Sequence, residues 1–453
     1  MFFTKVKITR KEKHNQLSYN TVLNILKGHP IKAFEKFNLH PHILKAIAHE
    51  NYENATAIQN KVIPAAMKGL DILGASKSGT GKTVAYVLPL LNKLQKVVKK
   101  EEKVVRALII VPTIELADQV SRTLLFFSKY LDIQTMKVQG GSKKSDQLHK
   151  LKQGADIVVA TPGRLQEFIH DKKINLEYIN TIILDEADTM LELGFLAEIK
   201  SILKSCTQPK QMMCFSATIS QNIKKLSKEF LRDPAIVEVS HRRDVVNFIK
   251  HRAYKVDKKR KAELTAKLVK DMGAAQVLVF VNTKESANTL FEYFKSQDIW
   301  TTLIHGDINR GGRARALTLF KSGKSQVLIA TDIAARGIDI PELPLVINYD
   351  LPNETDSFTH RVGRTGRANH KGAVVTLLTI EDYNAFTTIE KHLKLNVKRE
   401  IKEGFEITDK QPRQARPRKK SLSEKKGKID YDKRRKYTYA AQKKKRAEAQ
   451  KKK

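Results

Sequence analysis

Short apolar runs alternate with longer stretches of helical periodicity over most of the chain. The runs include "ALIIVP", "DIVVATP", "TIILDE", "QVLVFVN", "QVLIATD" and "AVVTLL". Continuous apolar strands of this length, separated by helices, are typical of parallel sheets that are buried on both faces. The pattern therefore predicts an α/β fold in which helices flank parallel sheets.

The second half of the chain echoes the first at a fixed distance. "VPTIELA" resembles "VNTKESA", and "VVATPG" resembles "LIATDI". The threonines in these strings form two pairs, Thr113 with Thr283 and Thr161 with Thr331, and the members of each pair are 170 residues apart. Two matches at one offset indicate two similar α/β domains in tandem.

Changes in composition suggest where these domains begin and end. We predict a basic N-terminal extension, a first domain, a linker, a second domain and a basic low-complexity tail, at residues 1–30, 31–238, 239–247, 248–400 and 401–453.

The formal net charge of the 453-residue chain is +36, and this charge bears on which molecules the protein binds. Residues 410–453 hold 20 Lys and Arg against four Asp and Glu, and their apolar content is too low for a folded core, so we expect a disordered arm. So large an excess of cations favours a polyanionic partner, RNA or DNA ahead of membrane lipid. A solvated basic surface is the alternative.

Cysteine content and the start of the chain bear on its location. Two cysteines, Cys206 and Cys214, fit a reducing compartment and exclude a disulfide scaffold. The first residues contain no apolar segment of signal-peptide length, and no apolar run reaches the roughly 18 residues of a membrane helix. We therefore expect a cytoplasmic protein without a membrane partner.

The first half alone contains "SKSGTGKT", Ser76 to Thr83, after an apolar strand. Glycines let backbone N–H groups close around phosphates at a helix N-terminus. Lys82 would then meet the β- and γ-phosphates, and Thr83 the Mg²⁺. An ordinary glycine turn is the alternative when this motif is taken by itself.

Three acids follow the apolar strand of "TIILDEAD", at Asp185, Glu186 and Asp188. In α/β folds ligands sit at the carboxyl ends of the strands. An acid that faces a phosphate loop there can hold Mg²⁺, which prefers oxygen ligands. Asp185 fits this role, and Glu186 fits the group that positions or deprotonates the attacking water. A cluster that caps a helix is the alternative.

These letters, Asp185-Glu186-Ala187-Asp188, resemble the motif of the DEAD-box RNA helicases, and the resemblance extends from Phe34 to about residue 400. "ATAIQ", "PTIELADQ", "TPGR", "SAT", "VFVNT", "HGD", "TDIAARGID" and "HRVGRTGR" follow in the order of the family. The resemblance implies two tandem RecA-like domains, each a parallel sheet flanked by helices. It also implies an enzyme that hydrolyses ATP with Mg²⁺ in the presence of RNA.

The family pattern implies a role for each matching residue. Phe34 would stack on adenine, Gln59 would read it, and Gly337 and Asp339 would contact the ribose and phosphate side. Arg364 and Arg367 of the second domain would reach the γ-phosphate. The catalytic set is then Lys82, Asp185, Glu186, Arg364 and Arg367, the metal ligands are Thr83 and Asp185, and the nucleotide ligands add Ser78, Gly79, Thr80 and Gly81.

The remaining motifs imply an RNA track and a coupling group. The track consists of Pro112, Thr113, Gly140, Gly141, Thr161, Pro162, Arg164, Asn282, Thr283, Arg313 and Thr331, and the coupling group consists of Asp188, Ser216, Thr218 and His360. Such contacts would grip the RNA backbone without reading its sequence. For each threonine alone, a strand-end or helix-capping role is the alternative.

Four positions depart from the family pattern. Ser76 and Lys77 alter the phosphate loop, Ile114 stands where arginine is usual, and Arg310 replaces a glutamine after "HGD". None of the four belongs to the catalytic set, so RNA affinity and ATP coupling are the properties they put in question.

The leading hypothesis is an RNA-dependent ATPase that unwinds short duplexes or remodels ribonucleoprotein. An ATP-gated RNA clamp or annealing chaperone is the second hypothesis, and a DNA translocase is the third. The compact core with its short basic tail resembles stand-alone bacterial helicases of ribosome assembly or RNA turnover, and a nucleolar helicase of a eukaryote is similar. We expect a monomeric core.

Overall fold

The structure is a computed structural model. It describes residues 32–50, 52–76, 79–95, 104–206, 209–239, 249–335, 338, 340, 343–352, 354–365 and 372–409. The predicted N-terminal extension, most of the predicted linker and residues 410–453 lie outside these ranges.

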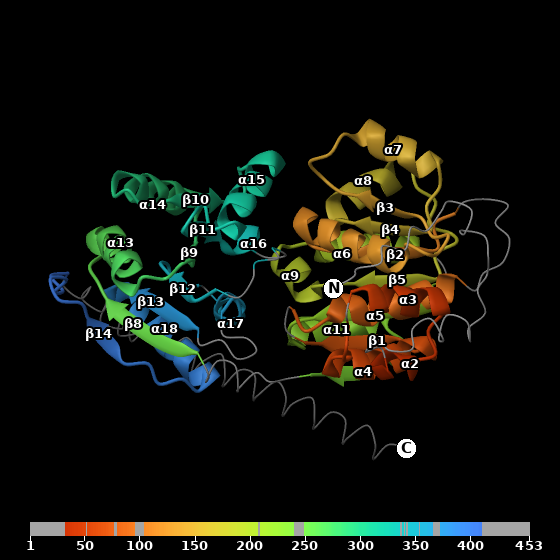
Figure 1. Cartoon of the computed structure of the whole chain (residues 1–453), viewed down its shortest axis with the longest axis horizontal. Helices are drawn as coiled ribbons and strands as arrows, with labels where there is room; N and C mark the ends of the chain where they lie inside the picture. Colours follow the sequence, from red (N-terminus) through yellow and green to blue (C-terminus); the bar gives the residue numbers. More distant parts are fainter. Residues whose placement is uncertain are drawn as a thin grey trace, which may run out of the picture. The chain divides into compact units, whose positions relative to one another are not determined.

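Seven strands, all parallel, form the first sheet, as the apolar runs predict (Figure 1). From one edge to the other they are β3 (Thr135–Val138), β4 (Ile157–Ala160), β2 (Ala107–Ile110), β5 (Thr181–Leu184), β6 (Gln211–Ser216), β1 (Ile72–Ala75) and β7 (Ala235–Glu238).

Helices pack against both faces of this sheet, because successive strand residues point to opposite faces. Ile109 lies in one apolar cluster and its neighbours Leu108 and Ile110 lie in the other. One cluster includes residues of α2 (Lys32–Glu35), α3 (Pro41–His49), α4 (Ala57–Met67), α5 (Lys82–Leu94) and α6 (Ile114–Phe127). The other includes residues of α8 (Pro162–His170), α9 (Ala187–Glu192), α10 (Leu196–Ser205) and α11 (Gln221–Phe230), while α7 (Lys144–Lys152) contributes partly buried leucines.

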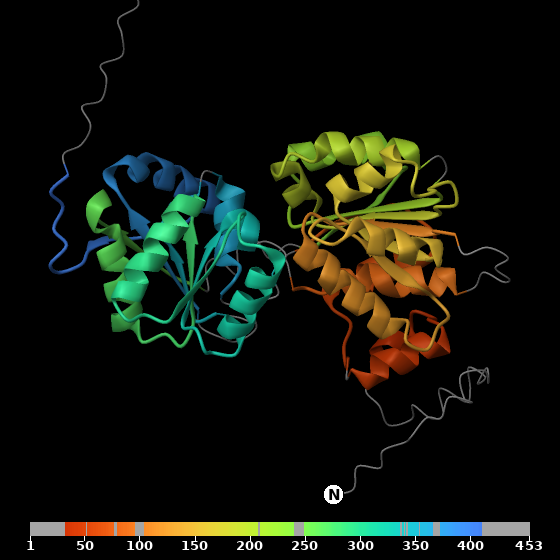
Figure 2. The same cartoon turned by 90° about the horizontal axis from the view of Figure 1, so that it is seen from above.

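The second sheet repeats the first in strand number and direction (Figure 2). Its order is β10 (Thr301–Ile304), β11 (Val327–Thr331), β9 (Val277–Val281), β12 (Leu345–Asn348), β13 (Ala373–Leu378), β8 (Lys250–Lys255) and β14 (Arg399–Ile401). The accompanying helices are η2 (Lys258–Arg260), α13 (Lys261–Met272), α14 (Lys284–Ser296), α15 (Arg310–Lys321), α16 (Asp332–Ala335), α17 (Thr355–Val362), η3 (Ile380–Asp382) and α18 (Tyr383–Leu393).

The echo in the sequence corresponds to equivalent places in the two sheets. β2 and β9 are both third in their sheets, and β4 and β11 are both second. Thr113 and Thr283 begin α6 and α14, and the hydroxyl oxygen of each accepts a hydrogen bond from the backbone N–H three residues later. The two tandem sheets of the prediction are therefore confirmed.

Packing on the second sheet continues past the predicted end of the domain at residue 400. The ring of Phe405 is 4% exposed and joins the apolar cluster under α13 and α14. The guanidinium of Arg260 lies over this ring, 4.3 Å from its centroid. The described part of the predicted tail is thus held by this ring, and also by an ion pair of Lys402 with Asp271 at 2.8 Å, which composition alone does not reveal.

In the ranges that the structure describes, no helix combines the length and the apolar character needed to cross a bilayer.

Candidate nucleotide and RNA site

The predicted phosphate loop joins β1 to α5, and glycines shape its described part. Gly79 and Gly81 have φ angles of 78° and 91°, in the left-handed region that favours glycine. Lys82 is the first residue of α5, so the unpaired N–H groups of the first helical turn lie next to the loop. Such an end is suited to bind phosphate. Lys77 and Ser78 lie outside the described residues.

The side chain of Lys82 is buried, and it lies across the loop. Its ammonium donates to the carbonyl of Ser76 at 2.5 Å and to that of Ser216 at 3.5 Å. These carbonyls follow β1 and end β6, which are neighbours in the sheet. Lys82 thus places a positive charge at the carboxyl end of the sheet.

Gln59 connects the same loop to the start of α4. Its amide nitrogen donates to the carbonyl of Gly81 at 3.3 Å, and its amide oxygen accepts from the backbone N–H of Thr56 at 2.9 Å. The second bond belongs to a capping box with Thr56. The structure therefore places Gln59 beside the phosphate loop.

Asp185 lies one residue past β5, with its carboxylate buried. One oxygen accepts from the hydroxyl of Tyr86 at 2.8 Å, and the other accepts from the backbone N–H of Glu186 at 3.0 Å. Burial raises the pKa of Asp185 above its ordinary value, and the positive charge of Lys82 opposes this shift.

Glu186 stands between β5 and α9 with φ 51°, which is unusual for a residue with a side chain. It occupies the cap position of α9, but its side chain makes no capping hydrogen bond. The structure does not support the alternative that this acid serves to cap the helix. Burial raises the pKa of Glu186, as do the charges of Asp185 and Asp188, while Lys82 lowers it. A carboxylate with a raised pKa is better matched to accept a proton from water.

Asp188 links this strand end to the next. One carboxylate oxygen accepts from the backbone N–H of Ala217 at 2.8 Å, and the other accepts from the N–H of Thr189 at 3.0 Å. The hydroxyl of Ser216 accepts from the N–H of Thr218 at 2.9 Å. Three of the four predicted coupling residues are therefore joined in one network.

The residues at this edge fit a magnesium ion. Asp185 supplies a buried carboxylate, and Thr83 supplies a hydroxyl from the first turn of α5. Within the described residues, no group of three or more His, Cys, Asp and Glu side chains could hold a metal. Mg²⁺ does not need such a group, because it is usually held by one or two carboxylates, nucleotide phosphates and water.

The strand order separates the two groups of predicted residues in the first sheet. The phosphate loop, the acids after β5 and the "SAT" residues lie at the ends of β1, β5 and β6, which are neighbours. The predicted RNA residues follow β2, β3 and β4, which are also neighbours at the other side of the sheet. All of them lie at the carboxyl ends of parallel strands, where ligands bind in such folds.

A hydrogen bond joins two of the predicted RNA segments at the first sheet. Arg164 donates to the carbonyl of Ser142 at 3.1 Å, which joins the "TPGR" and double-glycine segments. Ile114 would lie 3.4 Å from a Cβ on Gly141, so the unusual isoleucine packs beside this glycine. Thr113 caps α6, while Thr161 precedes α8 without a capping bond from its side chain. Gly140 and Pro162 lie in the same strand-end segments.

The RNA residues of the second sheet follow β9, β10 and β11 in the same way. Arg313 donates to the carbonyls of Ile308 at 3.0 Å and of His305 at 3.2 Å, so much of its guanidinium holds the "HGD" segment. The amide of Asn282 donates to the carbonyl of Leu351 at 2.8 Å. Thr283 caps α14, and Thr331 ends β11.

The residues predicted to act from the second domain are only partly described. Arg364 follows α17 and donates to the carbonyl of Ile338 at 3.0 Å. His360 lies on α17 and is partly buried. Gly337, Asp339 and Arg367 lie outside the described residues, and so does the side chain of Arg310. The predicted roles of these residues stay predictions.

The role predicted for Phe34 at the adenine stays a prediction, and the structure places its side chain in the core. This side chain is 0% exposed, and its ring packs edge-on against Phe37 and Tyr52, with centroids 5.9 Å and 6.3 Å away. Phe34 anchors the helices before the phosphate loop, because a large apolar ring gains most from burial.

Two residues that sequence reasoning did not single out have prominent places in the structure. Tyr86 contacts the predicted metal ligand Asp185 from inside α5. Arg361 is 1% exposed, forms an ion pair with Asp332 at 2.6 Å, and donates to the side chain of Asn282 at 2.8 Å. Arg361 falls within the motif "HRVGRTGR", so the sequence offered a reason to consider it. Tyr86 lies in an apolar stretch, and nothing in the sequence marks it as part of the site.

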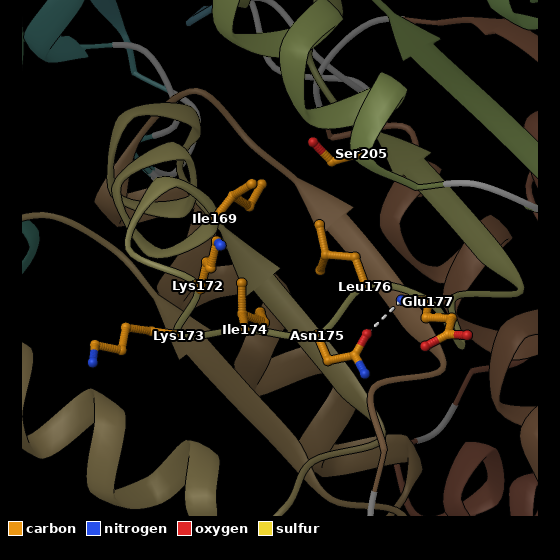
Figure 3. Close-up of a pocket in the computed structure, with 8 residues that line it drawn as sticks. All are labelled: Ile169, Lys172, Lys173, Ile174, Asn175, Leu176, Glu177 and Ser205. Carbon is orange, nitrogen blue, oxygen red and sulfur yellow. Dashed lines mark hydrogen bonds between the residues drawn. The ribbon is translucent and has the colours of Figure 1, made fainter.

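A pocket elsewhere in the first domain is not part of this site (Figure 3). It is lined by Ile169, Lys172, Lys173, Ile174, Asn175, Leu176, Glu177 and Ser205. Most of these residues belong to the segment that leads into the amino end of β5. The pocket therefore lies at the edge of the sheet opposite to Lys82 and Asp185.

Comparisons with known proteins agree with this geometry. The DEAD/DEAH box helicase family matches residues 56–226, and the helicase conserved C-terminal domain matches residues 260–369. The ATP-dependent RNA helicase CshA of Listeria monocytogenes is 36% identical over 361 residues, which are 80% of this chain and 69% of that protein. The DEAD-box ATP-dependent RNA helicase CshA of Bacillus subtilis is 35% identical over 366 residues, 81% of this chain and 73% of that protein.

A solved structure extends the likeness to three dimensions. Dbp5 of S. cerevisiae bound to RNA and ADP BeF3 matches with a TM-score of 0.72 and 28% identity, covering 82% of this chain and 96% of the other. The helices and strands of the two parallel-sheet domains run from residue 32 to residue 401. The phosphate loop, the acids after β5 and these relatives together place the chain in the DEAD/DEAH box helicase family, as an ATP-dependent RNA helicase.

Proposed function

We propose that this helicase hydrolyses Mg²⁺-bound ATP at the carboxyl ends of β1, β5 and β6, and that the cycle separates short RNA duplexes or remodels ribonucleoprotein. The observation that carries the proposal is the contact of Asp188 with the N–H of Ala217 at 2.8 Å. It joins the acids after β5 to the "SAT" segment after β6. A change at the nucleotide therefore has a direct path to the neighbouring strand end.

The phosphates would lie against the N-terminus of α5, where Lys82 and the loop N–H groups neutralise their charge. Thr83 and Asp185 would hold Mg²⁺, which supplies charge neutralisation at the phosphate oxygens when it is bound. Glu186 would orient the attacking water and take its proton. Arg364 and Arg367 of the second domain would complete the set, because arginines stabilise charge in the transition state.

RNA would lie along the other half of each sheet, at the ends of β2, β3 and β4 and at the ends of β9, β10 and β11. Threonine hydroxyls, helix N-termini and glycine N–H groups suit phosphates and 2′-hydroxyls, so we propose binding through the RNA backbone without preference for sequence.

We further propose a monomeric core in the cytoplasm, or the nucleolus if the source is eukaryotic, acting in ribosome assembly or RNA turnover. Crosslinking the protein to RNA in cells, followed by sequencing of the bound RNA, tests the proposed role in ribosome assembly or RNA turnover.

Glu186→Gln tests the chemistry. An amide can hold the water but cannot take its proton, so we expect ATP affinity close to that of the wild type and RNA-stimulated hydrolysis lowered by about 100-fold or more. The matched control is Glu192→Gln, an exposed acid on the same helix, which should hydrolyse ATP normally. Normal turnover by Glu186→Gln would contradict the role proposed for this carboxylate.

Duplex separation is measured with the same proteins. The wild type should separate a short RNA duplex when ATP is present, and Glu186→Gln should stay bound to RNA and ATP without releasing the strands efficiently. If the wild type hydrolyses ATP and remains on RNA for many turnovers without separating strands, the protein is instead an ATP-gated clamp. Stimulation by DNA equal to that by RNA would indicate a DNA translocase.

A further inference from the structure

Tyr86 reaches the nucleotide site from inside the core. It lies one turn into α5, its side chain is 0% exposed, and its hydroxyl donates to one carboxylate oxygen of Asp185 at 2.8 Å. The other oxygen of Asp185 accepts from the backbone N–H of Glu186 at 3.0 Å. Both oxygens of the acid are therefore oriented, one of them by the backbone of the next residue and the other by a side chain 99 residues away.

The same helix carries the second predicted magnesium ligand. Thr83 precedes Tyr86 by three residues on α5, so the two side chains share a face of the helix. The hydrogen bond from Tyr86 to Asp185 therefore joins the face of α5 that carries Thr83 to the acid after β5.

The ring of Tyr86 is fixed in this direction by the sheet. It packs on Phe215 of β6, with centroids 5.2 Å apart and an angle of 40° between the planes. Phe215 in turn needs Gly74 beside it in β1, because a Cβ at residue 74 would lie 2.6 Å from two atoms of the phenyl ring. Gly74, Phe215 and Tyr86 therefore form a packed series that ends at the carboxylate of Asp185.

A buried tyrosine hydroxyl needs a partner in any case, so the contact has a purely structural alternative. The partner decides between the two, because the hydrogen bond of this hydroxyl ends on the carboxylate that is proposed to hold the ion. We propose that Tyr86 is a positioning residue, which holds Asp185 in the orientation that receives Mg²⁺. This inference rests on the proposed magnesium site.

Tyr86→Phe tests the inference by removing one oxygen atom and leaving the ring in place. Partners that orient metal ligands typically change metal affinity 10-fold to 100-fold when they are removed. We expect Mn²⁺, measured by electron paramagnetic resonance with a non-hydrolysable ATP analogue, to bind about 10-fold more weakly. Nucleotide affinity in EDTA should stay within about twofold of the wild type, because the phosphate loop is intact. Half-saturation of the ATPase by Mg²⁺ should rise in parallel with the Mn²⁺ dissociation constant.

Tyr254→Phe is the matched control, since Tyr254 is 5% exposed and its hydroxyl contacts only Arg252, at 3.3 Å, among the described hydrogen bonds of the second sheet. This variant should keep wild-type Mn²⁺ affinity. Thermal unfolding of the ligand-free variants measures the purely structural effect. If Tyr86→Phe lowers the unfolding temperature but leaves Mn²⁺ affinity unchanged, the positioning role is overturned.

Asp185→Asn, alone and combined with Tyr86→Phe, separates this inference from the proposed site. If Tyr86 acts through Asp185, the second substitution should add little to the loss caused by the first. Full additivity would overturn the inference while leaving the ion site in place. Wild-type Mn²⁺ affinity in Asp185→Asn would overturn the magnesium site itself, and the inference with it.

Discussion

Cys214 sits in β6 two residues before Ser216, and Cys206 follows α10; both thiols are free and buried. Burial raises the pKa of each to about 12. For Cys214 the negative charges of Asp188 and Asp185 act in the same direction, because they disfavour a thiolate nearby. The thiolate is the reactive form, so at pH 8 only on the order of 10⁻⁴ of each thiol is able to react.

We therefore expect neither cysteine to react with a thiol reagent in the native protein at pH 8. The rate should rise with pH, because deprotonation becomes more frequent as the pH approaches the pKa. The measurement is labelling by iodoacetamide followed by mass spectrometry, and protein unfolded in guanidinium chloride, where both thiols should be labelled, is the control. Rapid labelling of native protein at pH 8 would contradict the burial of these residues.

At the scale of elements, the start of α5 depends on its neighbour α4. Gly81 caps α5 with φ 91°, and its carbonyl accepts from the amide of Gln59 at 3.3 Å. A Cβ at residue 81 would lie 2.4 Å from that amide nitrogen. The phosphate loop therefore requires a residue without a side chain at this position for two reasons, backbone conformation and space.

Gly81→Ala and Gly69→Ala separate the two reasons. Gly69 also has a positive φ, of 81°, but no atom lies within 4 Å of a Cβ placed there. Each substitution should lower the free energy of unfolding by about 1–2 kcal/mol through backbone strain. Only Gly81→Ala should also weaken ATP binding, because the alanine displaces Gln59. Chemical denaturation and nucleotide titration measure these effects, and equal ATP affinities in the two variants would argue against the contact with Gln59.

At the scale of the whole molecule, an excess of positive charge is concentrated in the C-terminal segment of the chain. Residues 410–453, which lie outside the described ranges, carry 20 of the 84 Lys and Arg residues and only four of the 48 Asp and Glu residues. Every motif of the nucleotide and RNA site lies before residue 400. A cationic arm neutralises phosphates and releases counterions, so its contribution to RNA binding depends strongly on salt.

Deleting residues 410–453 should weaken RNA binding mainly at low salt and flatten its dependence on salt concentration. At saturating RNA the shortened protein should keep its ATPase, because the catalytic residues are untouched. Large structured RNAs should be affected more than short duplexes, since an anchor raises local concentration only where a second site exists. An unchanged salt slope would reject the anchor, and loss of ATPase at saturating RNA would indicate that the arm supports the folded domains.

The sequence by itself determined the features that depend on local order. The phosphate loop before α5, the acids after β5 and the echo at 170 residues are each contained in short strings, because a strand, a turn and the next helix are adjacent in the chain. Those strings predicted two parallel sheets and placed Lys82, Asp185 and Glu186 at strand ends. The family resemblance then assigned chemistry to them.

Only the tertiary structure decided which strand ends are neighbours. The order of the first sheet brings β1, β5 and β6 together and sets β2, β3 and β4 apart, although β2, β3 and β4 come between β1 and β5 in the chain. Tertiary packing likewise buried Phe34, extended the second domain to Phe405 and brought Tyr86 to Asp185. Hydrogen bonds and apolar contacts between distant residues set these outcomes, and no local pattern records them because each partner lies many residues away in the chain.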